Sequence, residues 1–84
     1  MKKPRYFLWK KTNYEGEYAN GKRNWKGQLI SIFGDYLTFE GEFFYNEKRK
    51  GKEYYRNGKV KFEGEFLLGK PWNGKGYDFN GKLI

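Results

Sequence analysis

The sequence predicts an all-β protein, a single-layer antiparallel β-meander built from tandem two-strand hairpin repeats. Three observations favour this fold class over the others. A segment with the pattern aromatic-Glu-Gly-Glu-aromatic occurs three times along 84 residues. Turn dipeptides recur with it, and the apolar residues follow no period of 3.6 that would indicate a helix. The chain therefore reads as one small repeat domain of about six or seven short strands.

The repeat has a period near 23 residues. The three aromatic segments are Tyr14–Tyr18, Phe39–Phe43 and Phe62–Phe66, whose central glycines are 41 − 16 = 25 and 64 − 41 = 23 residues apart. The turn dipeptides Gly34-Asp35, Asn57-Gly58 and Asn80-Gly81 are separated by 57 − 34 = 23 and 80 − 57 = 23 residues, and the glycines Gly27, Gly51 and Gly74 follow at steps of 24 and 23. We expect repeat units at about 14–38, 39–61 and 62–84, with the two extra residues of the first unit in its connections. Residues 1–13 fall outside the repeat and are expected to form an N-terminal arm or cap.

Each unit is predicted to form two strands. In the aromatic segment the period is two, so the rings and the glycine share one face and the glutamates occupy the other. The second strand of a unit leads to a turn dipeptide such as Asn57-Gly58, which is a strong hairpin signal. We expect rings of neighbouring strands to lie across the glycines of the first strands. The expected repeat core is Tyr14, Gly16, Tyr18, Phe39, Gly41, Phe43, Phe62, Gly64 and Phe66.

Composition excludes several classes of protein. The hydrophobic content is 37%, and Phe 8, Tyr 8 and Trp 3 supply most of the apolar mass. Without Cys or His the chain has no disulfides, no Cys/His zinc site, no thiol nucleophile and no histidine-based triad. The apolar run Tyr6 to Trp9 is shorter than a signal peptide needs, and no window reaches the ~20 apolar residues of a membrane span. We expect a cytoplasmic protein, with membrane association peripheral if it occurs.

Repeated glutamate pairs are the only candidate for catalysis. Glu15 and Glu17 lie two apart on one strand face, a spacing that invites comparison with the carboxylate pair of a glycosidase. The same pair recurs as Glu40/Glu42 and Glu63/Glu65, whereas an active site is normally a single constellation. We therefore expect the glutamates to form a charged sheet face. No enzymatic activity, catalytic residue, cofactor or metal site is predicted.

These residues resemble the MORN repeat family. Tyr14–Tyr18 followed by Asn20-Gly21-Lys22 and then Lys26-Gly27 is similar to its pattern of aromatic-x-Gly-x-aromatic, Asn-Gly-Lys and Gly-x-Gly. The similarity covers residues 14–84. It departs at Asn46–Arg49, which lacks the turn glycine, and at Leu29 and Glu53, where the second glycine of Gly-x-Gly is missing. The resemblance implies an elongated sheet used for protein contacts, for multimerisation or beside anionic membranes. Similar bacterial arrays occur in antitoxin-like proteins, which would make a toxin the partner.

Basic residues cluster between the two strands of each unit and indicate an anion-binding or partner-binding edge. With a net charge of +8, the chain carries equivalent groups of cations that repeat stacking would align. Two tryptophans at equivalent positions are either contact anchors or a lid over the rings. The candidate edge comprises Lys22, Arg23, Lys26, Lys48, Arg49, Lys50, Lys70, Trp25 and Trp72. A solvated edge that deters aggregation is the alternative.

Partner classes remain open at this stage. The segment 75–79 resembles the start of an RNA-binding strand, but Asp78 stands where Gly or Ala belongs and the helices of that fold are missing, so nucleic acid is not favoured. The final strand has no cap, so we expect either edge-strand or end-to-end association with another chain, such as a second copy, or a segment that belongs to a longer protein. We expect a non-enzymatic scaffold that contacts a protein or itself, with binding to anionic phospholipid as the alternative and antitoxin-like partner binding as a further one.

Overall fold

A computed structural model describes residues 12–34 and 36–84 and confirms the predicted fold class. Six strands form one open sheet, and each strand pairs antiparallel with its neighbour in sequence. The expected N-terminal arm lies mostly outside the described residues, but Thr12 and Asn13 pair with Ser31 and Ile30, so the first strand begins before the unit boundary at 14. The strands are β1 (Thr12–Ala19), β2 (Lys22–Ser31), β3 (Leu37–Phe44), β4 (Glu47–Tyr54), β5 (Val60–Leu67) and β6 (Lys70–Gly76).

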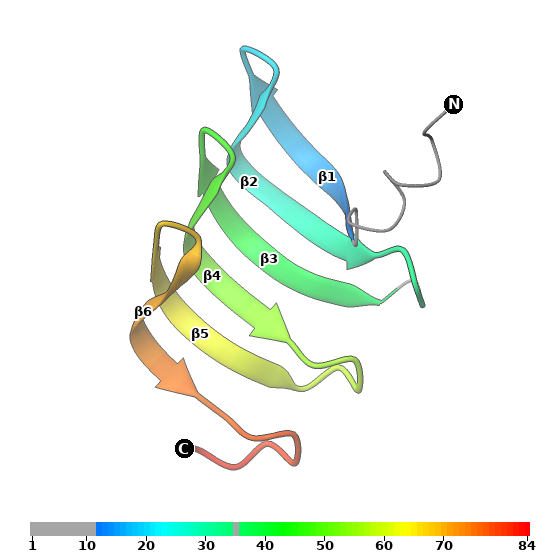
Figure 1. Cartoon of the computed structure of the whole chain (residues 1–84), viewed down its shortest axis with the longest axis vertical. Coiled ribbons are helices and arrows are strands. Elements are labelled where there is room, and N and C mark those ends of the chain that lie inside the picture. Colours follow the sequence, from blue (N-terminus) through cyan, green and yellow to red (C-terminus); the bar gives the residue numbers. More distant parts are fainter. Residues whose placement is uncertain (1–11, 35) are drawn as a thin grey trace, which may run out of the picture.

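The strands form three hairpins that stack side by side. Figure 1 shows the turns of the β1–β2, β3–β4 and β5–β6 hairpins along one side of the sheet and the connections between hairpins along the opposite side. The principal extents are 45 × 27 × 18 Å, as a single-layer sheet requires. After the last connection Leu83 forms an isolated bridge with Tyr77. Side chains at equivalent repeat positions are therefore brought into rows that cross all the strands.

A row of six glycines crosses the centre of the sheet. Gly16 pairs with Gly27, and the pairing continues strand by strand through Gly41, Gly51 and Gly64 to Gly74. A Cβ added to Gly41 would lie 2.7 Å from the Cα of Gly51, closer than real side chains come. The glycines therefore allow neighbouring backbones to approach closely in a bent sheet.

The rings lie across a different set of glycines from the one expected. The ring of Tyr14 covers Gly27, and a Cβ at Gly51 would lie 2.9 Å from Cζ of Phe39. Phe62 covers Gly74 in the same way. The covered glycines thus belong to the second strand of each hairpin, whereas those of the first strands meet mainly neighbouring backbone. The reason is that each ring reaches diagonally onto the next strand rather than along its own.

Six rings form one continuous ladder on this face, which we call the ring face. The centroids of Tyr14 and Tyr18 are 5.0 Å apart, and those of Tyr14 and Phe43 are 5.2 Å apart, both in edge-to-face geometry. The ladder continues through Phe39, Phe66 and Phe62 at 5.2–5.3 Å. Such pairs add about 0.5–1.5 kcal/mol each beyond the area that they bury. Phe39 is fully buried, and Leu29, Phe43 and Phe66 complete the small core.

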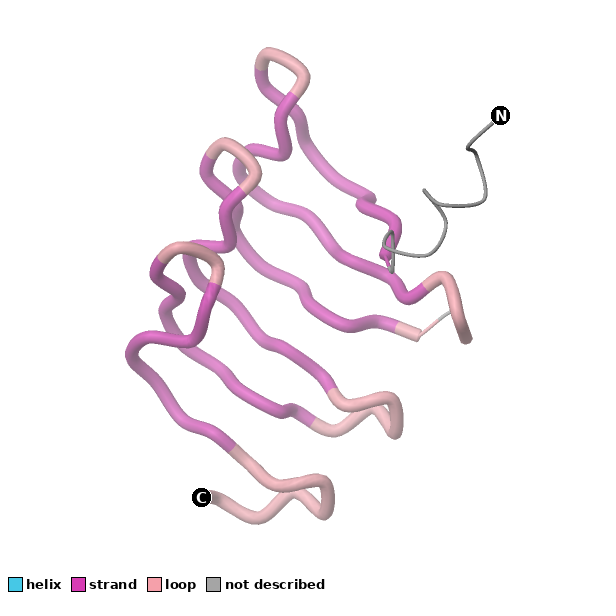
Figure 2. The backbone as a smooth tube through the Cα atoms, in the orientation of Figure 1, coloured by secondary structure: helices cyan, strands magenta, loops and turns pink. Residues whose placement is uncertain are grey.

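Each hairpin contains a β-bulge on its second strand. The register of β3 and β4 shifts between Glu42↔Lys50 and Phe43↔Lys48, which leaves Arg49 without an opposite residue. The same shift leaves Trp72 unpaired in β6, and the first hairpin accommodates two extra residues between Arg23 and Gly27. One of the two extra residues of the first unit therefore lies within β2, not in a connection as predicted. Figure 2 shows the backbone bending beside each hairpin turn, where the bulges lie.

Candidate functional site

An open groove lies beside the hairpin turns and is the main candidate site. It has a volume of about 580 Å³ and is lined in part by Trp25, Phe44, Arg49, Leu67 and Trp72. We call these five residues the hairpin groove. The side chain of Trp72 is 67% exposed and that of Trp25 is 55% exposed. Exposed apolar residues gathered beside cations are typical of an interaction surface.

The bulges place three of these residues. Trp25, Arg49 and Trp72 occupy the bulged segments of β2, β4 and β6, so they escape the strict alternation of the strands. The Arg49 guanidinium lies 5.4 Å from the ring centroid of Phe44, which holds it within the groove. Neither tryptophan takes part in the ring-ring pairs of the described residues.

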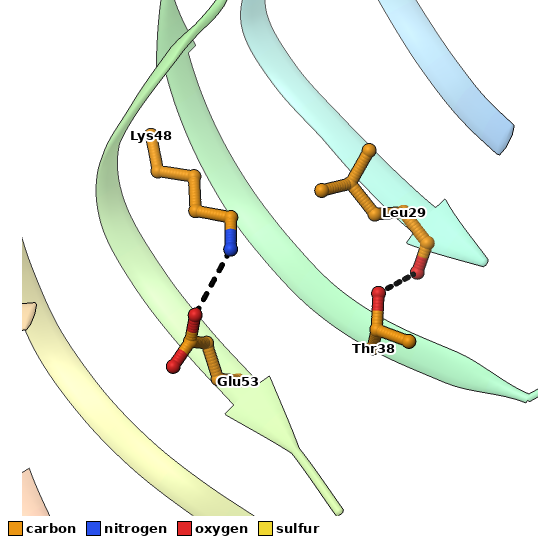
Figure 3. A network of polar contacts seen from close by, with 4 residues as sticks. All are labelled: Leu29, Thr38, Lys48 and Glu53. Carbon is orange, nitrogen blue, oxygen red and sulfur yellow. Dashed lines mark hydrogen bonds and ion pairs between the residues drawn. The ribbon is translucent and has the colours of Figure 1, made fainter. Parts of the chain in front are cut away.

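Two of the predicted edge cations face the ring ladder instead of solvent. The Arg23 guanidinium lies 5.1 Å from the ring centroid of Phe43, and its Nη2 donates a hydrogen bond of 2.7 Å to the Asn46 carbonyl oxygen. Lys48 Nζ lies 4.9 Å from the ring centroid of Phe39 and 2.9 Å from Glu53 Oε2 (Figure 3). These two side chains are part of the packing and do not contribute to a solvent-facing cationic row.

The other predicted cations are divided between the strand ends and the opposite face. Lys26 and Lys50 lie opposite Glu42 in the strand register. Lys22 and Lys70 begin β2 and β6 and are exposed. All seven cations belong to strands rather than loops. The expected single cationic edge is therefore replaced by a small exposed set near the hairpin turns and an alternating charged face.

The glutamate pairs occupy that charged face. Each lies beside strands that carry lysine, with Glu40 opposite Lys52 and Glu42 opposite Lys50. A shallow furrow of about 560 Å³ runs between the two charged rows over the glycines of β1 to β4. A glutamate pair recurs in each hairpin, with Glu15 opposite Gln28 in the first and Glu63 opposite Lys75 in the third.

Tyrosines on both faces have altered proton affinity. Burial raises the pKa of Tyr54 above its ordinary value of 10.0, and the nearby carboxylates of Glu40 and Glu63 raise it further. Burial also raises the pKa of Tyr14, whose hydroxyl donates a hydrogen bond of 2.6 Å to the Glu17 carbonyl oxygen. Both tyrosines are neutral near physiological pH.

Metal and membrane-spanning features are absent from the described ranges. Across residues 12–34 and 36–84, no cluster of three or more His, Cys, Asp or Glu side chains could hold a metal ion. The same ranges contain no helix with the length and apolar character needed to cross a bilayer.

Sequence reasoning missed the apolar residues at the hairpin turns. Phe44, Leu67 and Leu68 are exposed, and Leu68 reaches 80% exposure at the turn between β5 and β6. The signal for Phe44 and Leu67 was their position directly after the second ring of a repeat, where the alternation places a residue away from the ring face. Leu68 is the next residue and lies in the turn itself. Comparison with known proteins adds no further constraint: no protein-family model matches the chain, and no similar curated protein or solved structure was found.

Proposed function

We propose that this chain is a non-enzymatic MORN-type scaffold that binds a protein partner through the hairpin groove. The observation that carries the proposal is the collection of exposed apolar and cationic side chains from three successive hairpins into one groove. Trp and Arg are the residue types most enriched among the energetic anchors of protein interfaces. A partner that presents apolar side chains with an acidic group would match Trp25, Trp72 and Arg49.

The backbone at Trp25 supports a role in binding. Its φ of 77° lies in the left-handed region, which a bulky side chain rarely adopts. Such a conformation costs on the order of 1–2 kcal/mol of free energy. Because the indole is exposed, its packing offsets little of this cost. Strain at an exposed aromatic residue is consistent with a side chain held in place for a partner.

Photo-crosslinking in the source cells tests the proposal. A photoreactive phenylalanine analogue at position 72 is expected to give a covalent adduct with one or a few proteins. The matched control carries the analogue at Lys52, a residue of β4 beyond Gly51 that does not line the groove. The adduct at position 72 should be lost when Arg49→Glu is introduced. The proposal fails if positions 72 and 52 give the same adducts, or if neither gives one.

Anionic phospholipid is a second candidate, favoured by the hairpin turns themselves. Two adjacent turns expose apolar residues, Phe44 and Tyr45 in one and Leu67 and Leu68 in the next. Lys70 and Arg49 lie close to them in sequence, and cations beside exposed apolar residues favour an anionic membrane surface. An antitoxin-like role would instead make the groove's protein partner a toxin, which the identity of the adduct would reveal.

Vesicle co-sedimentation separates the lipid candidate from the protein candidate. The wild-type chain is expected to bind vesicles with phosphatidylserine, and a Leu67→Ser/Leu68→Ser variant to lose this binding if the turns insert. Lys48 is left unchanged, because it pairs with Glu53 beside the core. A wild-type chain that ignores anionic vesicles eliminates the lipid candidate and leaves the protein proposal standing.

A further inference from the structure

We infer that copies of this chain associate head to tail, with β1 of one copy adding to the open edge of β6 of another. This surface is distinct from the hairpin groove and extends the proposed scaffold to an assembly. Within the described part of the chain, β1 and β6 are the two end strands of the sheet. An exposed strand edge is a template for pairing with another strand.

The hydrogen bonds between β5 and β6 show which backbone groups of β6 face outward. The Tyr77 amide donates to the Lys61 carbonyl of β5 at 2.9 Å. Because backbone groups alternate in direction along a strand, the amide and carbonyl of Gly74 and Gly76 point away from β5. The Ile84 amide donates to the outward Gly76 carbonyl at 2.9 Å, which agrees with this direction. The Gly74 groups therefore face outward, and none of the described residues bonds to them there. Beyond Gly76 the edge is covered by the chain's own Leu83 and Ile84, which Thr12 and Asn13 of a second copy would displace.

The same alternation of hydrogen-bonded and non-hydrogen-bonded pairs can be followed across the sheet to β1. Gly64 and Gly74 face each other without exchanging hydrogen bonds, so the backbone groups of Gly64 point toward β4 and bond to Gly51. By the same alternation, Gly41 and Gly51 are a pair without hydrogen bonds, and Gly27 and Gly41 are a hydrogen-bonded pair. The alternation leaves the backbone groups of Gly16 facing outward on β1. A pair between Gly74 and Gly16 of a second copy would thus repeat the hydrogen-bonded glycine pairs that join one hairpin to the next within the chain.

Charge complementarity selects this register. Within the chain Lys52 lies opposite Glu63, and Lys50 lies opposite Glu65, where β4 meets β5. With Gly74 opposite Gly16 of the second copy, Lys75 lies opposite that copy's Glu15 and Asn73 opposite its Glu17. The alternation of glutamate and lysine strands then continues across the boundary. Opposite charges at directly facing positions stabilise antiparallel pairs.

The two ends of the ring ladder are also complementary. Between hairpins, the first ring of one unit contacts the second ring of the next, as in Tyr14–Phe43 and Phe39–Phe66. Phe62 is the first ring of the last unit and Tyr18 is the second ring of the first unit. Tyr18 is 60% exposed. In the head-to-tail pair, Tyr18 of the second copy would lie against Phe62 and extend the ladder without a break.

Cysteine crosslinking of the purified chain tests the register. The sequence has no cysteine, so Asn73→Cys in one chain and Glu17→Cys in another introduce single thiols. Facing residues that do not exchange hydrogen bonds bring their Cβ atoms to a distance that suits a disulfide. Mixing the two variants under mild oxidation is expected to give the mixed dimer as the main product. Lys50→Cys, at the equivalent position on the paired strand β4, replaces Asn73→Cys in the control and should give only background dimer.

A different crosslink or none would overturn the inference. Tail-to-tail pairing of two β6 strands about Gly74 would instead join Asn73→Cys to Lys75→Cys. If Asn73→Cys forms a disulfide with neither Glu17→Cys nor Lys75→Cys, although circular dichroism shows that the chains are folded, strand addition at β6 is excluded. Neither result bears on the hairpin groove, because the purified chain is the only protein present and the groove is tested at position 72 in cells.

Charge exchange provides an independent readout in sedimentation experiments. Lys75→Glu and Glu15→Lys are each expected to weaken self-association by roughly threefold to tenfold, since like charges then face each other. An equimolar mixture of the two variants should restore it, because each head then meets a tail of opposite charge. Lys52→Glu, which changes the equivalent charge on a strand paired on both sides, should leave self-association unchanged. Loss without recovery in the mixture would contradict the head-to-tail pairing.

Discussion

Lys48 Nζ lies 2.9 Å from Glu53 Oε2, and the ion pair crosses Gly51 on the ring face of β4 (Figure 3). Both side chains are partly buried, and the ammonium also lies 4.9 Å from the ring centroid of Phe39. A long cationic side chain thus covers the ladder while its charge is balanced by a carboxylate. The ion pair therefore connects the two ends of β4 across Gly51, which has no side chain of its own to cover this part of the ring face.

This pair is expected to be energetically coupled. In a double-mutant cycle with Lys48→Met and Glu53→Gln, we expect a coupling free energy of about 1 kcal/mol from urea denaturation, at the upper end for partly exposed ion pairs. High salt should reduce it. A coupling indistinguishable from zero at low salt would show that the two side chains act independently.

Phe39 should be the most sensitive position of the ladder. Phe39→Ala removes a fully buried ring and is expected to lower the free energy of unfolding by about 3–5 kcal/mol. Phe44→Ala, an exposed ring that follows Phe43 in the same strand, should cost less than about 1 kcal/mol. Similar losses for the two variants would mean that the core does not lie on the ring face.

The glycine row should not tolerate a methyl group. Gly51→Ala would place a Cβ 2.8 Å from the Cα of Gly41 and 2.9 Å from Cζ of Phe39, so we expect a loss of at least about 2 kcal/mol. Gly76→Ala is the control, because its Cβ would come no closer than 3.9 Å to the Lys61 carbonyl oxygen. Thermal melting of both variants measures the difference, and equal melting temperatures would argue against close backbone approach at the row.

Alkaline pH should destabilise the fold partly through Tyr54. Its pKa is raised in the folded state above the ordinary 10.0, so the unfolded chain loses the proton at lower pH. The stabilisation is full below about pH 10 and declines as the pH rises from there through the folded-state pKa. Melting profiles of wild type and Tyr54→Phe should therefore converge or cross above pH 10. Lysine titration affects both proteins and cancels in their difference, so parallel profiles would refute the assignment.

Trp25→Gly should separate stability from binding. Glycine adopts the φ of 77° without strain, and the exposed indole contributes little packing, so we expect a stability unchanged or raised by up to about 1 kcal/mol. The crosslink from position 72 should nevertheless weaken. A marked loss of stability would instead identify Trp25 as a structural residue and remove one support for the groove.

Much of the fold could be predicted from the sequence because the repeat is periodic at two levels. Alternation within Phe39–Phe43 places the rings, and the 23-residue period places the hairpins. The bulges could not be predicted, since one unpaired residue in a strand leaves no compositional signal. Counting back from Gly51 by twos would put Arg49 on the ring face, whereas the bulge puts Lys48 there. The division of the cations between packing and solvent follows from that single shift.

The pairing of every strand with its neighbour in sequence has a consequence for how the chain folds. Contacts between strands close only short loops, so little chain entropy is lost before each contact forms. We expect rapid folding in which any hairpin can form first and the sheet then grows outward from it. The core is shared between adjacent hairpins, and within the described residues the β1–β2 and β5–β6 hairpins each pair with one other hairpin. Fraying should therefore begin at these two hairpins. Amide hydrogen exchange would show this as protection that is highest in β3 and β4 and declines toward β6.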